Sequence, residues 1–152
     1  MTKLTKSLLA TLMLFSMMAG LASCSDDDEP KKEPAREIAG TYEGYSEASS
    51  AYFTGQISEG DNVVITAVDS EHAKIVYTST EFGTVTIESA TVTGDGTYTF
   101  SGSGTTSMGH AGSVKDYDCT ATGVVSNGSV EMEVVVPAVM GGFTLDFHTG
   151  AQ

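Results

Sequence analysis

From residue 38 onward, the chain is a series of short segments in which apolar and polar side chains alternate. In one of them, Ile75 and Tyr77 fall on one face, whereas Lys74 and Val76 fall on the other. Successive side chains of a β-strand point to opposite faces, so this period of two predicts strands with one face turned to a core. Outside the first 23 residues, no segment has the apolar spacing of an amphipathic helix. The predicted strands cover residues 40–46, 52–58, 62–68, 73–80, 84–93, 97–102, 114–125, 130–136 and 143–148.

Turn residues separate these segments throughout. Residues 93–96 (Thr-Gly-Asp-Gly) and 126–128 (Ser-Asn-Gly) are strong hairpin signals, because Asn-Gly and Asp-Gly favour tight turns between antiparallel strands. Sequential hairpins favour an up-and-down meander, and closing the meander into a barrel removes its exposed edges. The segments amount to eight or nine strands, and we therefore expect an all-β fold, a single antiparallel up-and-down eight-stranded barrel.

The inward-facing candidates of this barrel are bulky. An interior enclosed by about eight strands is either filled by side chains or just wide enough for one small ligand. Cys119 shares a strand face with Tyr117 and Ala121, which predicts a buried, inert thiol. The aromatic candidates favour a filled interior; they are Tyr42, Tyr77, Tyr98, Phe100, Tyr117, Phe143 and Phe147.

The amino-terminal 23 residues have the pattern of an export signal. Lys3 and Lys6 precede an uncharged apolar run at residues 8–21, which is shorter than the roughly 20 apolar residues of a membrane-spanning helix. The run ends in Leu21, Ala22, Ser23 and Cys24, which resemble the lipobox of bacterial lipoproteins. The resemblance implies cleavage before Cys24 and a lipid on its thiol. The alternative is an ordinary signal peptide followed by a chance cysteine.

An acidic segment follows the cysteine directly. Acidic and proline-rich residues bury too little apolar surface to fold, so residues 25–37 are predicted to form a solvated linker. This divides the chain into a lipoprotein signal peptide (1–23), a lipidated cysteine with its linker (24–37) and a barrel domain (38–152). The start of the linker also resembles the export signal of Bacteroidetes-type surface lipoproteins. This resemblance implies an outer-membrane lipoprotein that faces the medium; the alternative is a lipoprotein anchored on the periplasmic side. The residues of the signal are Ser25, Asp26, Asp27, Asp28 and Glu29.

The charge balance is strongly acidic. After removal of residues 1–23, five basic residues face 20 acidic ones, and from Ile38 onward only Lys74 and Lys115 face 14 acidic residues. Nucleic-acid binding depends on neutralising phosphates with basic side chains, so this composition argues against a nucleic-acid partner. It favours a soluble, monomeric barrel domain.

Three segments resemble the calycin-like β-barrel domain of small surface lipoproteins. They are residues 38–44 (IAGTYEG), 94–102 (GDGTYTFSG) and 139–150 (VMGGFTLDFHTG), in an order that spans the predicted barrel. The resemblance implies a meander of about eight strands that is distantly lipocalin-shaped. Lipocalins carry Gly-x-Trp at the first strand, but here Tyr42 replaces the tryptophan, and the chain has no tryptophan at all. We therefore interpret Tyr42 as a plug at one barrel end in preference to a ligand contact.

Catalytic machinery is not predicted by any motif. His72, His110 and His148 are far apart in the sequence and lack metal-ligand spacing, which favours exposed histidines and no metal or other cofactor. The serines of the Gly-Ser stretches lack the strand-turn-helix setting of a nucleophile elbow. Acidic pairs on strand faces, Asp116 with Asp118 and Glu131 with Glu133, favour a solvated surface over the alternative of weak Ca²⁺ binding. We therefore expect no enzyme activity.

Two segments are predicted to be mobile loops, residues 101–113 and residues 137–142. Loops on a rigid barrel are where binding residues concentrate, and methionine packs against varied shapes. Met108, His110, Met140 and Tyr42 are therefore candidates for a ligand mouth. We expect a lipid-anchored, surface-exposed binding protein for a small apolar molecule, a peptide or a glycan, attached to the outer membrane by its lipid. The alternatives are an accessory protein with a filled barrel and an inhibitor of a secreted enzyme.

Overall fold

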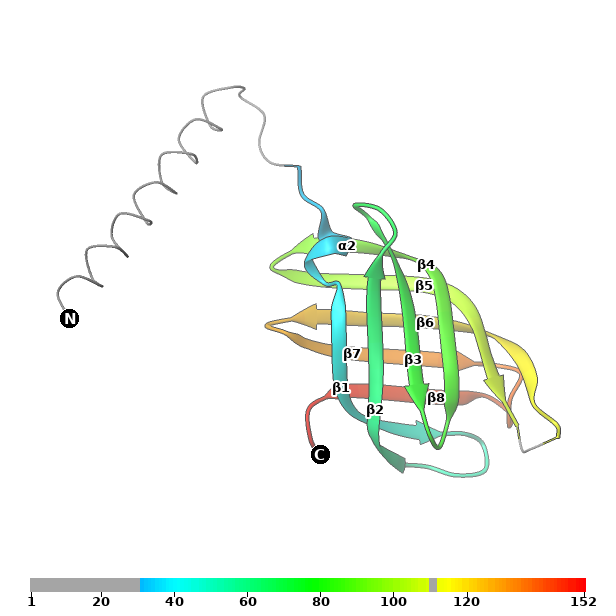
Figure 1. Ribbon diagram of the computed structural model, residues 1–152. Helices are drawn as coiled ribbons and strands as arrows, with labels where there is room; N and C mark the ends of the chain where they lie inside the picture. The colour runs from blue at the N-terminus through cyan, green and yellow to red at the C-terminus, as the bar shows by residue number, and fades with distance from the viewer. Residues whose placement is uncertain (1–30, 110–111) are drawn as a thin grey trace, which may run out of the picture. The chain divides into compact units, whose positions relative to one another are not determined.

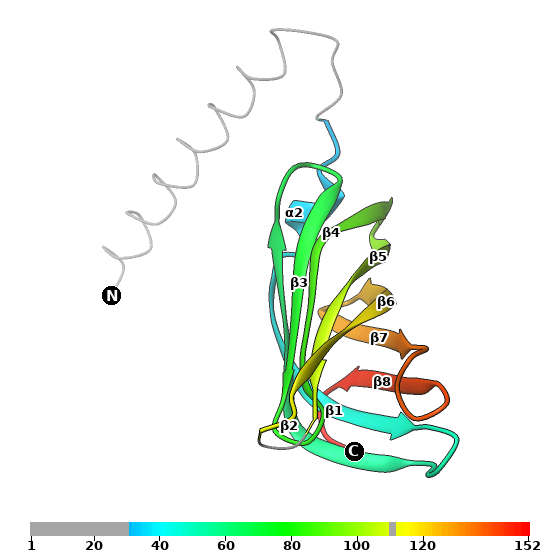
Figure 2. The same ribbon diagram turned by 90° about the vertical axis from the view of Figure 1, so that its right-hand side faces the viewer.

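The structure, a computed structural model, describes residues 31–109 and 112–152, and eight antiparallel strands within them close into a barrel (Figures 1 and 2). Each strand pairs with the next along the chain, and β8 closes the barrel by pairing with β1. This confirms the all-β, up-and-down prediction. The strands are β1 (Gly40–Ser49), β2 (Gln56–Ala67), β3 (His72–Ser79), β4 (Gly83–Asp95), β5 (Thr97–Met108), β6 (Lys115–Ser126), β7 (Ser129–Val136) and β8 (Phe143–Thr149).

Strand β2 is continuous where the sequence predicted two strands, and that prediction was wrong. Tyr52 lies in the β1–β2 connection with 80% of its surface exposed. The alternation breaks at Gly60, which has φ +72° and no partner on β1, since Gly44 pairs with Asp61 and Tyr45 with Glu59. Gly60 therefore forms a β-bulge inside one strand, and not a turn between two.

Strand β5 extends through most of the predicted 101–113 loop, so that prediction was also wrong. Gly102 and Gly104 lie where β5 crosses β4 closely: a Cβ atom would lie 2.7 Å from the Ile87 Cγ2 atom at Gly102 and 2.0 Å from the Thr86 carbonyl oxygen at Gly104. These glycines permit the close approach of two strands. The glycine- and serine-rich composition of this segment is typical of a loop, but in this barrel it reflects tight packing within the sheet.

The two predicted hairpin turns are present. Asn127 and Gly128 connect β6 to β7 with φ of 52° and 76°, the left-handed conformation that a tight hairpin turn needs at both positions. Gly96, with φ +81°, connects β4 to β5. Both predictions rested on residue types that adopt positive φ at little cost.

A short helix, α2 (Pro34–Glu37), packs against one end of the barrel, where the sequence predicted linker. Ala35 and Ile38 are fully buried, and the Ala35 amide donates to the Ser70 carbonyl in the β2–β3 connection at 3.1 Å. The Tyr42 hydroxyl donates to the Ile38 carbonyl at 2.8 Å. The ordered domain therefore begins before Ile38, because apolar residues of the predicted linker close this end.

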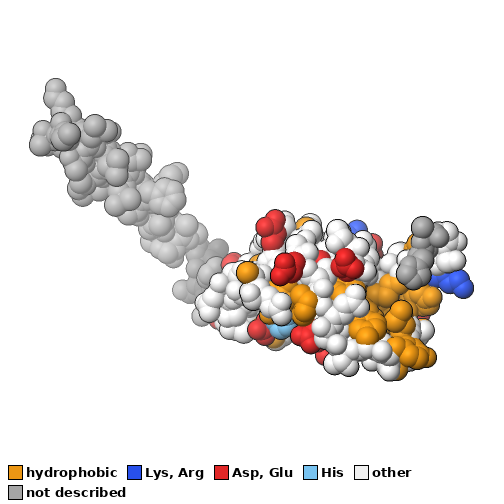
Figure 3. All heavy atoms as spheres, turned by 90° about the horizontal axis from the view of Figure 1, so that it is seen from below, with side chains coloured by type: hydrophobic (Ala, Val, Ile, Leu, Met, Phe, Trp, Pro, Cys, Tyr) orange, Lys and Arg blue, Asp and Glu red, His pale blue; other side chains and the backbone are white. Residues whose placement is uncertain are grey.

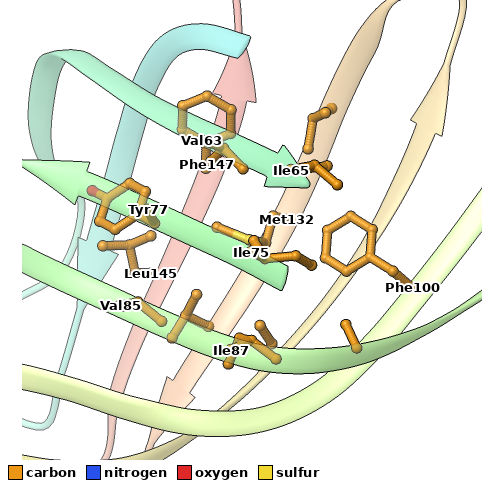
Figure 4. Packing of buried hydrophobic residues seen from close by; sticks show 14 of the residues in the cluster. Val63, Ile65, Ile75, Tyr77, Val85, Ile87, Phe100, Met132, Leu145 and Phe147 are labelled. Carbon is orange, nitrogen blue, oxygen red and sulfur yellow. The ribbon is translucent and has the colours of Figure 1, made fainter. Parts of the chain in front are cut away.

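The barrel interior is filled by side chains. Figure 4 shows Ile75, Phe100, Met132, Leu145 and others pointing toward one another from opposite sides of the barrel. The prediction of a filled interior is confirmed. Of the seven predicted inward aromatic residues, Tyr77, Phe100, Phe143 and Phe147 are buried, and Tyr42, Tyr98 and Tyr117 are partly buried against the same core.

Candidate functional site

The loops of the barrel are divided between its two ends. The β1–β2, β3–β4, β5–β6 and β7–β8 connections lie at the end opposite α2, as the meander requires. Met108 ends β5 at this loop end, partly buried against the core, and Met140 lies in the β7–β8 connection, 51% exposed. Tyr42 lies at the α2 end, and His110 is outside the described residues. The structure therefore does not bring Tyr42 together with the two methionines as one mouth.

Three phenylalanines pack together at the loop end. The Phe143 ring lies 6.3 Å from the Phe53 ring and 6.0 Å from the Phe82 ring, measured between centroids, in edge-on geometry. Phe53 comes from the β1–β2 connection, Phe82 from the β3–β4 connection and Phe143 from the start of β8. Edge-on aromatic packing of this kind is favourable, and here it caps the core below it.

A group of polar side chains is buried inside the barrel beneath this cap. The Gly60 bulge shifts the alternation of β2, so that Ser58 and Asp61, three residues apart, both point inward. Asp61 is completely buried. Ser46 of β1 and Ser79 of β3 are buried beside them, together with the ring of Tyr77.

Every oxygen of this polar cluster has a partner. The Asp61 carboxylate accepts from the Ser58 hydroxyl at 2.8 Å and from the Tyr77 hydroxyl at 2.7 Å. The Tyr77 oxygen lies 2.9 Å from the Ser46 hydroxyl, and the Ser58 and Ser79 hydroxyls are 3.0 Å apart. Burial raises the pKa of the Tyr77 phenol, so it remains a proton donor to Asp61. A satisfied network of this kind fixes a unique core arrangement and leaves no group free to act on a ligand.

Outside this cluster, the described titratable groups include the His72–Asp69 pair and Cys119. Within residues 31–109 and 112–152, no three His, Cys, Asp or Glu side chains gather as a metal site would require. The His72 Nδ1 atom lies 2.9 Å from Asp69, where the backbone amide of Glu71 and the His72 side chain lower the pKa of the Asp69 carboxyl. Cys119 is buried, as predicted, and burial raises the pKa of its thiol, which disfavours the reactive thiolate.

Two hollows lie on the outer surface of the described barrel. One, of about 430 Å³, lies over β4, β5 and β6 and is lined mainly by hydroxyl side chains such as Thr93, Thr99 and Thr122. The other, of about 590 Å³, lies over β1 and β2 beside the carboxyl-terminal residues. Its lining is Glu43, Gly44, Tyr45, Glu59, Gly60, Asn62, Gly150, Ala151 and Gln152.

Acidic side chains are spread over the face of the barrel seen from below, and an apolar patch occupies one edge of it (Figure 3). Among the described residues, the large exposed apolar residues Tyr52, Val114 and Met140 belong to loop-end connections, whereas Val68 lies in the β2–β3 connection and Val124 on β6. Three of these five exposed apolar residues therefore lie at the loop end of the barrel.

The closed eight-stranded meander agrees with the family model of the calycin-like β-barrel domain, which matches residues 38–149. The chain belongs to this family. The calycin-like domain here accounts for nearly the whole described region, as the three sequence segments implied.

A solved structure with the same barrel comes from Bacteroides fragilis, a protein named "putative outer membrane protein". It superposes on this calycin-like chain with a TM-score of 0.68 and 30% sequence identity. The alignment covers 78% of this chain and 46% of the Bacteroides protein, so the chain spans about half the length of that relative. None of the curated proteins matches the chain. Among the residues that the structure describes, no helix is long and apolar enough to cross a membrane.

Two features of the calycin-like barrel were missed by sequence reasoning. The inward position of Asp61 was hidden because Gly60-Asp61-Asn62 has the composition of a turn. The hollow over β1 and β2 depends on the pairing of β1 with β8, which brings residues 150–152, far away in the sequence, beside Glu43. The glycine within the β2 pattern was the available signal, since isolated glycines in strands mark bulges.

Proposed function

We propose that this protein is a lipid-anchored, non-enzymatic protein of the outer membrane, displayed to the medium, that recognises its partner with the outer surface of its barrel. The observation that carries this proposal is the filled interior. Side chains from all eight strands occupy the space that a small apolar ligand would need in a lipocalin-shaped carrier.

The sequence supports the anchor and the display. Cys24 ends an uncharged apolar run with the residues of a lipobox, and acidic residues follow it directly. Both features lie outside the described residues. The name of the Bacteroides relative places that protein at the outer membrane, which agrees with this proposal.

The environments of Asp61 and Cys119 support the absence of catalysis. The carboxylate of Asp61 is fully engaged by hydroxyl donors inside the core, and Cys119 is buried with a raised thiol pKa. General acid–base and nucleophilic catalysis both require a group that can reach a substrate. We therefore assign recognition, and not turnover, to the protein.

The lipid anchor is tested by Cys24→Ser. We expect the unmodified protein to fractionate with membranes and the variant to appear in the soluble fraction, because the thiol is the site of acylation. Cys119→Ala is the matched control, since it removes the other cysteine from a buried position and leaves Cys24 intact. Recovery in the membrane fraction of Cys24→Ser protein that mass spectrometry shows to have lost residues 1–23 would reject the anchor.

Surface display is tested by treating intact cells with a protease. We expect the protein to be degraded while a periplasmic protein survives, which shows that the envelope is intact. Replacing residues 26–29 with alanine should leave the protein attached to the membrane but protected from the protease. If the protein with its native sequence resisted digestion in intact cells, the barrel would lie on the periplasmic side.

A further inference from the structure

We propose that the hollow over β1 and β2 is a binding site for a neutral sugar ring, with Tyr45 as its aromatic wall. This rests on the proposed function, because it assigns the outer-surface recognition to one place. None of the candidate mouth residues lines this hollow, whose described lining comes from the two strands and from residues 150–152.

Tyr45 is held in position by its neighbour on β8. Tyr45 pairs directly with His148 on one side and with Glu59 on the other, so the three side chains form a row across the outer face. The Tyr45 and His148 rings lie 5.4 Å apart between centroids and are tilted by 31°. His148 therefore supports the side of Tyr45 toward β8, and the side toward β2 faces the hollow, which Glu59 and Asn62 also line. A fixed aromatic face loses little conformational entropy when a ligand stacks on it.

A glycine makes room for a ligand here. A Cβ atom built on Gly60 would meet no atom within 4 Å, so the bulge leaves open space where any other residue would project a side chain. The resulting volume of about 590 Å³ is in the range of roughly 300–1,000 Å³ found for small-molecule sites.

The chemistry of the lining fits hydroxyl groups best. The Glu43 and Glu59 carboxylates accept hydrogen bonds, the Asn62 amide both donates and accepts, and the Tyr45 hydroxyl does the same. A sugar hydroxyl also donates and accepts, and the C–H face of a sugar ring is apolar enough to stack on tyrosine. An ammonium group would be attracted by the two carboxylates, but it has donors only and would leave the amide and hydroxyl donors of the lining without an acceptor on the ligand, so methylamine is the comparison probe. An anionic ligand would meet two carboxylates on a body with two basic and 14 acidic residues from Ile38 onward.

Saturation-transfer NMR with the full chain tests this site. The probes are the methyl glycosides of glucose, galactose, mannose and N-acetylglucosamine, compared with methylamine and glucuronate. We expect transfer to the ring protons of at least one neutral glycoside, and an affinity about tenfold weaker in Tyr45→Ala, as loss of an aromatic contact implies. Gly60→Asn should also abolish the signal, because asparagine tolerates positive φ and its side chain would occupy the hollow.

Two matched controls separate the site from general effects. Tyr52→Ala removes an exposed tyrosine outside the hollow, and Gly128→Asn makes the same change at another open, positive-φ glycine. Both should bind as the native protein does. The proposal is overturned if no neutral glycoside gives a signal, if methylamine alone binds, or if Tyr45→Ala and Tyr52→Ala behave alike. None of these results would alter the fractionation or protease results, so failure of the sugar site is distinguishable from failure of the proposed function.

Discussion

The Gly44→Val protein is expected not to close its barrel. A Cβ atom on Gly44 would lie 1.9 Å from the His148 carbonyl oxygen and 2.9 Å from the Thr149 Cα atom, and both are backbone atoms of β8. Because β8 pairs with β1 from Gly44 to Ser49, the added side chain would push the closing strand away at the start of this ladder. We expect a loss of about 4 kcal/mol or more in the free energy of unfolding, the range of exceptional single substitutions.

Denaturant unfolding followed by far-UV circular dichroism measures this loss, since the chain has no tryptophan for fluorescence. Gly40→Val is the matched control on the same strand. The nearest atoms to its added Cβ are those of the Tyr42 ring at 3.9 Å, an ordinary contact. Both variants replace glycine with valine in the same strand, so the intrinsic strand preference of valine is the same in both and cannot explain a difference in their stability. Equal stability of the two variants would show that β8 can move outward at little cost.

The sequence predicts a strand of this barrel well where the strand lies between two neighbouring strands and its side chains alternate strictly between the core and the outer surface. Ile75 and Tyr77 of β3 are buried, as predicted, because β3 lies between β2 and β4 with one face toward a filled core. The prediction failed where glycine has a role set by a neighbouring strand. Gly60 and Gly104 have local sequences typical of turns or loops, and only the pairing partner shows that one forms a bulge and the other permits close packing.

The candidate site was less predictable than the fold. Tyr45 and His148 are about 100 residues apart in the sequence and become neighbours only through barrel closure. Met108 and Met140 both lie at the loop end, whereas Tyr42 belongs to the other end because β1 begins beside α2. Which positions share a surface therefore depends on strand order and register, and these are not encoded in any single segment.

Removal of the Asp61 carboxylate should strongly destabilise the barrel. In Asp61→Ala, the hydroxyls of Ser58 and Tyr77 lose their shared acceptor in a site that water does not reach. An unsatisfied buried donor costs about 1–3 kcal/mol, so we expect the free energy of unfolding to fall by about 3 kcal/mol. Asp118→Ala makes the same change on the exposed face of β6 and should alter stability by less than about 0.5 kcal/mol.

A double-mutant cycle with Tyr77→Phe tests whether the network is the cause. Alone, Tyr77→Phe removes one donor and should cost about 1 kcal/mol. Combined with Asp61→Ala, it also removes a hydroxyl that has lost its carboxylate acceptor, so the double variant should be less destabilised than the sum of the two single variants. We expect a coupling of about 1 kcal/mol or more, typical of residues in one hydrogen-bonded network. Strict additivity would mean that Asp61 stabilises the barrel by filling space and not by accepting hydrogen bonds.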